Sequence, residues 1–204
     1  MIPITNLKFE NELWLAYKNI AGLDEAGRGA LAGPVYVGAV IFPKNNSHLL
    51  KSLNGVQDSK QLTPAKRQQL IPQIKKYSLA WGIGFSSAKE IDEVGIVPAT
   101  RLAAMRALEN LSIFPNYLLT DFRLELPESD IPQTAIVKGD QKSLSIASAS
   151  ILAKTARDEM MRELHQQYPQ YIFSNHKGYG TLLHRTKIKQ LGHSPIHRKT
   201  FKIK

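Results

Sequence analysis

Of all the segments of the sequence, residues 20–29 constrain the fold most. They predict a buried strand that ends in two adjacent acids and is followed by a glycine-rich turn. Residues 20–23 are apolar, Asp24 and Glu25 follow them, and Gly27, Arg28 and Gly29 come next. Two carboxylates 4 Å apart repel each other by about 4 kcal/mol at an effective dielectric constant of 20. A hard divalent cation offsets this repulsion because it binds carboxylate oxygens. The segment therefore predicts a metal site at a strand end.

The glycine turn can bring backbone N–H groups and the Arg28 guanidinium against a phosphate. Carboxylates, a metal and a phosphate together indicate phosphodiester chemistry. Residues 27–32 also fit the dinucleotide-binding pattern G-x-G-x-x-A. That pattern needs a helix after the loop, whereas Gly33, Pro34 and a predicted strand follow here, and the two acids would repel a pyrophosphate. A dinucleotide-dependent dehydrogenase is therefore the weaker alternative, which a cofactor titration would settle.

The composition is that of an ordinary soluble globular protein, and it excludes several classes. The 204 residues are 43% hydrophobic and 22% charged, which predicts one domain with a full core. Cysteine is absent, so disulfides and thiolate metal sites are excluded. The N-terminus does not resemble a secretory signal, and no run approaches the roughly 20 apolar residues of a membrane helix. We therefore expect a cytoplasmic protein that does not bind membranes, with a monomer as the default.

Positive charge is concentrated in the last fifth of the chain. Residues 164–204 hold eight Lys and Arg and no acid, whereas the whole chain has a net charge of +10. The same stretch holds five of the six histidines, and its aromatic residues can stack on sugars and bases. A basic surface attracts polyanions, and nucleic acid is the first candidate. A solvated basic tail is the alternative.

Apolar periodicity and turn residues predict that strands and helices alternate. Strands are expected at residues 19–25, 35–42, 79–85, 117–120 and 134–138, with the first two joined as a hairpin. Helices are expected at residues 6–18, 63–77, 98–111, 143–167 and 182–191, and Ser87 with Glu90 predicts a capping box on a further short helix. Residues 44–62 are expected to form a loop. This order predicts an α/β fold with a five-stranded mixed sheet flanked by helices.

Further acids are expected at strand ends on the same edge of the sheet. Asp121 closes one buried-looking strand, and Asp140 follows the next. Open sheets bind ligands at the carboxyl ends of their strands, so these side chains can converge with Asp24 and Glu25. Oxygen ligands without His or Cys favour Mg²⁺ or Mn²⁺ over zinc. The alternative is that single acids are caps, turn residues or ion-pair partners, as we expect for Asp158 inside the long helix.

Two motifs near the C-terminus carry histidines. His193 and His197 have half of the spacing of a zinc finger, but no cysteine completes it, so we expect phosphate contact or packing instead. In the second motif Tyr179 lies between two glycines beside basic residues, which suits the presentation of a ring to a sugar. A core tyrosine in a turn is an equal alternative.

Several segments in order resemble bacterial ribonuclease HII, of the ribonuclease H-like superfamily. They cover nearly the whole chain, from about residue 20 to residue 201. The segments are DEAGRG at 24–29, GP at 33–34, DSK at 58–60, IDEVGI at 91–96, KGD at 138–140, IASASILAK at 146–154, RD at 157–158, HKGYGT at 176–181 and HR at 197–198. No single motif is decisive, but the ordered set is highly specific.

The resemblance implies a ribonuclease H-like fold in one catalytic domain, 1–204, with a core at about 19–160 and a basic helical C-terminal extension at about 161–204. It implies endonucleolytic cleavage of RNA in RNA/DNA hybrids and at ribonucleotides embedded in duplex DNA. Two Mg²⁺ or Mn²⁺ ions are expected to carry out a hydrolysis that leaves 5′-phosphate and 3′-hydroxyl ends.

The resemblance also implies roles for individual residues. The family's catalytic carboxylates, which also bind the metals, correspond to Asp24, Glu25, Asp121 and Asp140. Its substrate-binding residues correspond to Gly27, Arg28, Gly29, Ser59, Lys60 and Tyr179. The glycine–arginine–glycine element senses the 2′-hydroxyl at an RNA–DNA junction, the serine–lysine pair contacts phosphates, and the tyrosine stacks on the sugar of the neighbouring deoxynucleotide.

The chain departs from the family at three positions. Ala30 replaces a proline, Phe122 replaces a small glycine, and Thr200 replaces a serine. Two further alternatives remain at this point: a nucleic-acid-binding module without catalysis, and a metal nuclease on the same scaffold that resolves DNA junctions. A duplex with one ribonucleotide, compared with DNA junctions, separates these possibilities.

Overall fold

A five-stranded mixed sheet forms the centre of the protein, in a computed structural model that describes residues 5–44, 46 and 48–203. The strand order is β3-β2-β1-β4-β5. The strands are β1 (Ile20–Ala26), β2 (Val35–Ile41), β3 (Ala80–Ser86), β4 (Tyr117–Asp121) and β5 (Gln133–Ile136). β2 is antiparallel to both β1 and β3, whereas β1, β4 and β5 run parallel. The predicted mixed sheet and its first hairpin are therefore confirmed.

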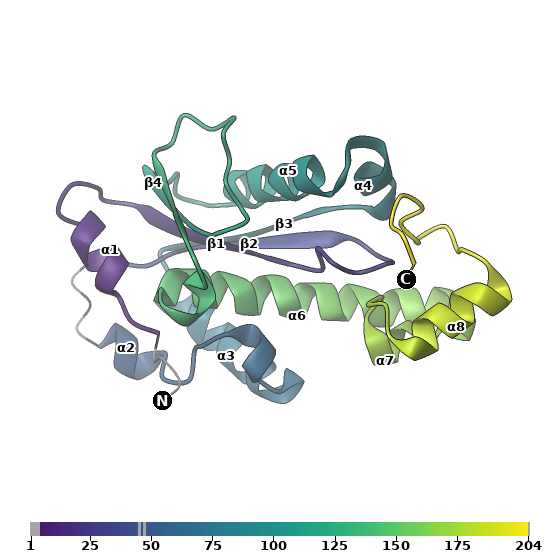
Figure 1. Ribbon diagram of the computed structural model, residues 1–204. Coiled ribbons are helices and arrows are strands. Elements are labelled where there is room, and N and C mark those ends of the chain that lie inside the picture. Colours follow the sequence, from purple (N-terminus) through teal and green to yellow (C-terminus); the bar gives the residue numbers. More distant parts are fainter. Residues whose placement is uncertain (1–4, 45, 47, 204) are drawn as a thin grey trace.

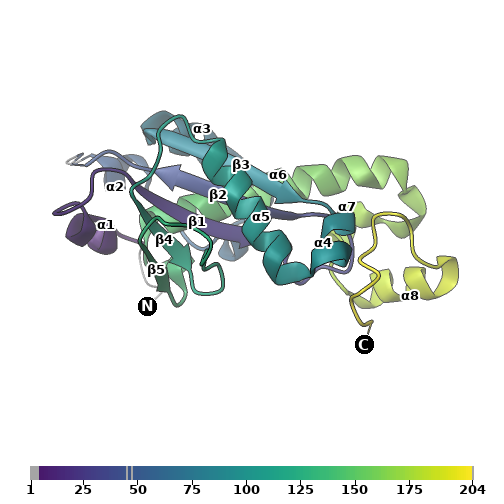
Figure 2. The ribbon, with the colours of Figure 1, turned by 90° about the horizontal axis from the view of Figure 1, so that it is seen from above.

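Helices cover both faces of this sheet. They are α1 (Lys8–Leu13), α2 (Leu49–Ser52), α3 (Pro64–Tyr77), α4 (Ala88–Val94), α5 (Ile96–Glu109), α6 (Leu144–Gln167), α7 (Phe173–His176) and α8 (Leu182–Leu191). Three single turns of 3₁₀ helix accompany them: η1 (Ser59–Gln61), η2 (Gly139–Gln141) and η3 (Pro169–Tyr171). Figures 1 and 2 show α4 and α5 over one face, α3 and α6 over the other, and α7 and α8 at the far end of α6.

The long helix α6 packs directly on β1 and β2, and it comes closest where Ser145 and Ala149 meet the glycines of these strands. A Cβ at Gly22 of β1 would lie 2.3 Å from the backbone carbon of Ser145, so only glycine permits this approach. The start of α6 is also held from outside the sheet. The buried Glu10 carboxylate of α1 accepts hydrogen bonds from the Ser145 N–H at 3.0 Å and from the Ser143 hydroxyl at 2.6 Å. These hydrogen bonds hold the start of α6 against the face of the sheet that it covers.

Most predicted elements are found, with differences of a few residues. The capping box of α4 is present, and Gly192 ends α8 as expected. The N-terminal helix is shorter than the expected 6–18, because the chain turns after Leu13 and buries Trp14. The expected loop at 44–62 contains α2 and η1. The fifth strand ends at Ile136 because Lys138 takes a left-handed conformation, with φ 55°.

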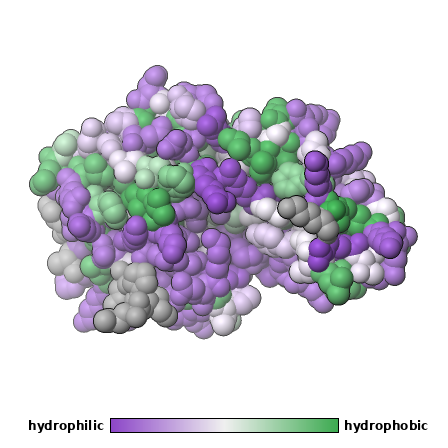
Figure 3. Space-filling view, viewed as in Figure 1, coloured by the Kyte–Doolittle hydropathy of each residue, from purple (hydrophilic) through white to green (hydrophobic). Residues whose placement is uncertain are grey.

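Among the described residues, no helix combines the length and apolar character that a bilayer crossing requires. The face of the molecule seen in Figure 1 is mostly hydrophilic, with separate green patches among the purple (Figure 3).

Candidate active site

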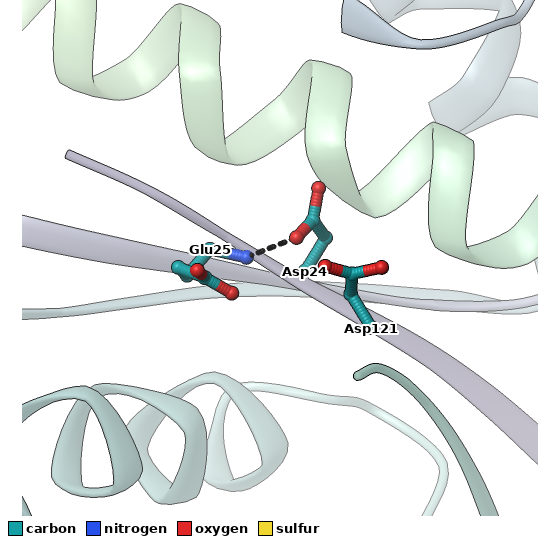
Figure 4. A group of neighbouring side chains, drawn as sticks. All are labelled: Asp24, Glu25 and Asp121. Carbon is teal, nitrogen blue, oxygen red and sulfur yellow. Dashed lines mark hydrogen bonds between the residues drawn. The ribbon is translucent and has the colours of Figure 1, made fainter. Parts of the chain in front are cut away.

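Three carboxylates from two neighbouring parallel strands meet at the carboxyl end of the sheet. Asp24 and Glu25 lie near the end of β1, and Asp121 ends β4. The register pairs Leu23 with Thr120, which makes Asp24 and Asp121 neighbours. One oxygen from each of the three carboxylates lies within 4.8 Å of the others. Figure 4 shows the Asp24 and Asp121 carboxylates next to each other, with the Asp24 side chain pointing toward α6.

This cluster is electrostatically unfavourable unless a cation joins it. Burial, and then the charge of Glu25, raise the pKa of Asp24 well above its usual value. Burial also raises the pKa of Glu25, although Arg28 opposes the change. Within the described part of the chain, the buried Oε2 of Glu25 has no hydrogen-bond partner. A hard cation such as Mg²⁺ or Mn²⁺ fits this all-oxygen donor set, because it would relieve the repulsion and satisfy the orphaned oxygen.

Asp140 lies beside this cluster rather than within it. Its carboxylate forms an ion pair with Lys60, with Oδ2 and Nζ 3.7 Å apart. The N–H of the preceding Gly139 donates a hydrogen bond of 2.8 Å to Asp121 Oδ1, which ties η2 to the end of β4. Burial, and then the charge of Asp58, raise the pKa of Asp140, whereas Lys60 lowers it. The structure thus brings three of the four predicted carboxylates together and places the fourth next to them.

A pocket of about 220 Å³ opens next to the carboxylates, and Glu25 belongs to its wall. The wall includes all the residues predicted to bind substrate: Gly27, Arg28, Gly29, Ser59, Lys60 and Tyr179. They come from three segments that are far apart in the sequence. Pockets with a few convergent polar groups are the usual places of ligand binding, so the predicted metal site and the predicted substrate residues form one continuous site.

The loop at residues 27–29 presents backbone N–H groups that can donate hydrogen bonds to a ligand. The N–H groups of Gly27, Arg28 and Gly29 donate no hydrogen bond to any described residue. A Cβ at Gly29 would meet no atom within 4 Å, so this glycine borders open space. The Arg28 Nη1 donates a hydrogen bond of 2.9 Å to the Arg123 carbonyl. Consecutive unpaired N–H groups beside a guanidinium suit an anion.

The two members of the predicted serine–lysine pair differ in exposure. Ser59 is buried, and its hydroxyl lies 2.9 Å from the Ser150 hydroxyl, which opposes the rise in the pKa of Asp24. Lys60 is exposed, and its N–H donates a hydrogen bond of 2.9 Å to the Asp58 carboxylate. Burial would lower the pKa of Lys60, but the nearby carboxylates, Asp24 first, raise it. The group that faces solvent in this pair is therefore the Lys60 ammonium.

Two basic residues without a predicted role, Lys154 and Arg157, lie around the Tyr179 ring. Lys154 Nζ is 5.7 Å and Arg157 Cζ is 5.1 Å from the ring centroid. The buried Asp158 carboxylate contacts Lys154 Nζ at 2.5 Å and Arg67 Nη2 at 3.0 Å, which confirms Asp158 as an ion-pairing acid. Both basic residues lie within segments that carry the family resemblance, and this is the only sequence signal that could have found them.

Comparison with known proteins agrees with this arrangement. A family model described as "Ribonuclease HII" matches residues 21–204. This chain belongs to the Ribonuclease HII family. It is therefore a metal-dependent hydrolase of the ribonuclease H type, as the sequence resemblance implies.

Curated members of the Ribonuclease HII family are similar over most of their length. The Ribonuclease HII of Desulfitobacterium hafniense (strain Y51) is 48% identical over 196 residues, which cover 96% of this chain and 73% of that protein. The Ribonuclease HII of Dehalococcoides mccartyi (strain ATCC BAA-2266 / KCTC 15142 / 195) is 50% identical over 193 residues, which cover 94% and 90%.

Solved structures confirm the ribonuclease H-like fold. The ribonuclease H2 from Pyrococcus horikoshii OT3 superposes with a TM-score of 0.74 at 28% identity, covering 91% of this chain and 94% of that one. Bst-RNase HIII in complex with Mn²⁺ superposes with a TM-score of 0.65 at 18% identity, covering 90% and 67%, and this likeness concerns the fold alone.

Proposed function

We propose that this ribonuclease cleaves the RNA strand of RNA/DNA hybrids and cleaves duplex DNA at embedded ribonucleotides. One observation carries the proposal. A cluster of three carboxylates suited to a divalent cation opens directly onto a pocket lined by unpaired N–H groups, basic side chains and an aromatic ring. Such a pocket can hold a sugar-phosphate backbone while the acids hold the metal.

We propose that Asp24, Glu25, Asp121 and Asp140 hold two Mg²⁺ or Mn²⁺ ions when substrate is present. When bound, such ions would supply activation of the attacking water and stabilisation of the leaving 3′-oxygen. Asp140 has a particular place in this scheme. Its ion pair with Lys60 is long, at 3.7 Å, and it joins an exposed ammonium to a buried carboxylate. A cation held by Asp140 would replace Lys60 as the partner of this carboxylate, and the exposed ammonium could then contact a substrate phosphate.

The pocket residues supply recognition. The 2′-hydroxyl is the group that distinguishes a ribonucleotide from a deoxynucleotide. In this proposal the backbone of Gly27 and Gly29 contacts the hydroxyl, Arg28 holds the adjacent phosphate, and Tyr179 stacks on the next sugar. We also propose that residues 1–204 act as one catalytic domain, in which the basic segment 161–204 adds a grip that is independent of sequence.

A labelled DNA duplex with one ribonucleotide tests the function. Incubation with Mg²⁺ or Mn²⁺ is expected to give one cut, with a 5′-phosphate on the fragment that begins at the ribonucleotide. The same duplex made only of DNA and a four-way DNA junction are expected to stay intact. Cutting of the junction at a similar rate would instead favour a junction-resolving nuclease. Binding of every substrate without any cut would favour a non-catalytic module.

A further inference from the structure

Two arginines are buried in the core, and neither forms an ion pair with a carboxylate of the residues that the structure describes. Arg157 of α6 and Arg198 near the C-terminus are 0% and 1% exposed. Burial lowers the pKa of both guanidiniums, that of Arg198 to about 9. A buried charge is costly unless hydrogen bonds compensate it, so the partners of these two side chains indicate what they are retained for.

All the hydrogen bonds of the two guanidiniums go to backbone carbonyls of residues 27–34. Arg198 donates to the carbonyl oxygens of residues 27, 28 and 33, at distances of 2.8 to 3.0 Å. Arg157 donates to those of residues 32 and 34, at 3.2 and 2.9 Å. Gly27 permits this contact, because its φ is +92° and a Cβ there would lie 1.8 Å from Arg157 Nε. We call these two side chains the arginine clasp.

The clasp fixes the direction of the N–H groups that line the pocket. In a planar trans peptide the C=O and the N–H point to opposite sides. The carbonyls of Gly27 and Arg28, which Arg198 holds, belong to the same peptide groups as the N–H groups of Arg28 and Gly29. Those two N–H groups must therefore point away from Arg198, and they have no partner among the described residues.

The same clasp connects the loop at residues 27–29 (the glycine loop) to residues 177–181 between α7 and α8 (the tyrosine loop). The Arg157 guanidinium lies 5.1 Å from the Tyr179 ring centroid. The Gly178 carbonyl accepts a hydrogen bond of 2.8 Å from the Leu31 N–H, and the Arg198 N–H donates one of 2.9 Å to the Leu31 carbonyl. Both loops and the C-terminal segment therefore form one hydrogen-bonded unit around the two guanidiniums.

We propose that Arg157 and Arg198 are positioning residues for ribonucleotide recognition. They turn the N–H groups of Arg28 and Gly29 toward the substrate, and they make the C-terminal segment part of the specificity site in addition to its basic surface. The inference rests on the proposed function, in which the glycine loop contacts the ribonucleotide. It requires the planar fork of arginine, because a lysine ammonium carries the charge but cannot reach three carbonyls in this geometry.

The test compares two duplexes of the same sequence, one with a single ribonucleotide and one of DNA alone. Binding is measured with Mg²⁺ in an Asp24→Asn background, which prevents cleavage. Adding Arg198→Lys is expected to reduce the preference for the ribonucleotide by about tenfold, which corresponds to about 1.4 kcal/mol. Affinity for the DNA duplex should change less than twofold, because the charge is kept. Arg101→Lys, at an exposed ion pair with Glu128, is the matched control and should change neither affinity.

An Arg198→Lys protein that is folded by circular dichroism and keeps the full preference would overturn the inference while leaving the proposed function intact. Equal affinity of the Asp24→Asn parent for the two duplexes would overturn the proposed function and this inference with it. A measurement on the unaltered protein covers the case in which the variant does not fold. The Nε–H groups of Arg157 and Arg198 should exchange with solvent far more slowly than that of Arg101, and equal exchange rates would refute the clasp.

Discussion

The carboxylate cluster and the loops that carry the predicted substrate residues, at 27–29 and around Tyr179, differ in the interactions that hold them. The cluster gathers like charges on two adjacent strands, where the register of β1 and β4 places Asp24 beside Asp121. The loops contain flexible glycines, and buried side chains from distant segments hold them in place. The first region stores unfavourable electrostatic energy that a ligand can relieve. In the second region, backbone N–H groups are held in fixed directions, so that a ligand can accept hydrogen bonds from them.

This difference determines how each region should respond to change. Neutralising a carboxylate removes repulsion, so the free protein should become more stable while catalysis is lost, as is common where function opposes stability. Removing an anchor of the loops should weaken recognition and leave metal binding intact.

The largest effect is expected for Asp24→Asn. The variant should retain duplex binding but lose at least about a thousandfold in cleavage rate, equivalent to about 4 kcal/mol of transition-state stabilisation. Single-turnover cleavage of the ribonucleotide duplex measures the loss, with the exposed Asp130→Asn as the control. Retention of more than a tenth of the rate would show that Asp24 is not a metal ligand.

Tyr179→Ala should lower kcat/KM roughly 5- to 150-fold, on the scale of the about 1–3 kcal/mol that an aromatic ring contributes when it stacks on a base, applied here to the sugar. The loss should lie mainly in KM, and the affinity for Mn²⁺ should not change. Tyr179→Phe keeps the ring and should retain nearly full activity. A Phe variant as impaired as the Ala variant would assign the role to the hydroxyl instead of the ring.

Mg²⁺ should stabilise the free protein, because it binds the folded carboxylate cluster and not the unfolded chain. At a concentration 100 times its Kd the gain is about 2.7 kcal/mol, and each 1 kcal/mol raises Tm by about 2–4 °C in a chain of this size. Thermal unfolding with and without Mg²⁺ measures the shift. Asp24→Asn should show a higher Tm than the wild type without metal and a much smaller gain with it. An equal gain in both proteins would place the binding site elsewhere.

Low pH should destabilise the packing of His184 and His197 behind the tyrosine loop. His184 Nδ1 donates to the Tyr179 carbonyl at 3.0 Å, so its Nε2 accepts from His197 Nε2–H at 3.1 Å, and His197 Nδ1 accepts from the Ser194 N–H at 2.9 Å. This series of hydrogen bonds requires both imidazole rings to be neutral. Burial, and then a neighbouring histidine, lower the pKa of each ring to about 4.

Because these pKa values are lower in the folded state than the value of about 6.5 in an unfolded chain, the unfolded state binds more protons between the two values. The stability that these rings contribute is complete above about pH 6.5 and is lost as the pH falls toward 4. Tm measured against pH should therefore decline in this window. His197→Gln should flatten the decline, and the exposed His48→Gln should not. An identical slope of Tm against pH in the wild type and both variants would show that His197 does not cause the decline.

The smallest effect is expected for Lys60→Ala. Each phosphate contact adds about 0.9 to the slope of log K against log salt concentration, so the variant should bind duplex with a slope shallower by about that amount. Lys89→Ala, at an exposed ion pair with Glu93, is the control. An unchanged slope of log K against log salt concentration would mean that Lys60 pairs with Asp140 and does not contact a phosphate.

Local sequence patterns explain how the carboxylates come together, but they do not show what holds the loops in place, and the reason is physical. An acid that closes a buried strand is a local signal, and parallel strands bring such acids to one edge, as found for Asp24 and Asp121. The placement of Asp140 beside Lys60 instead of inside the cluster depends on the 3₁₀ turn after a left-handed Lys138. The Gly139–Asp140 pair is typical of a turn, but no local pattern indicated that the turn would place Asp140 beside Lys60.

The arginine clasp could not be predicted from periodicity. Arg157 stands among charged residues of a helix and reads as a solvated side chain, and Arg198 stands in a basic tail. Both are buried because the carbonyls of residues 27–34 surround them, more than 120 positions away. Only the family resemblance marked these positions, and it gave them no role.

The most direct test of the account is the position of bound Mn²⁺ in crystals of this protein. Anomalous diffraction should show a peak coordinated by oxygens of Asp24, Glu25 and Asp121, and the peak should disappear in Asp24→Asn crystals. Mn²⁺ bound at another site, with these three carboxylates left without an ion, would contradict the claim that they form the metal centre.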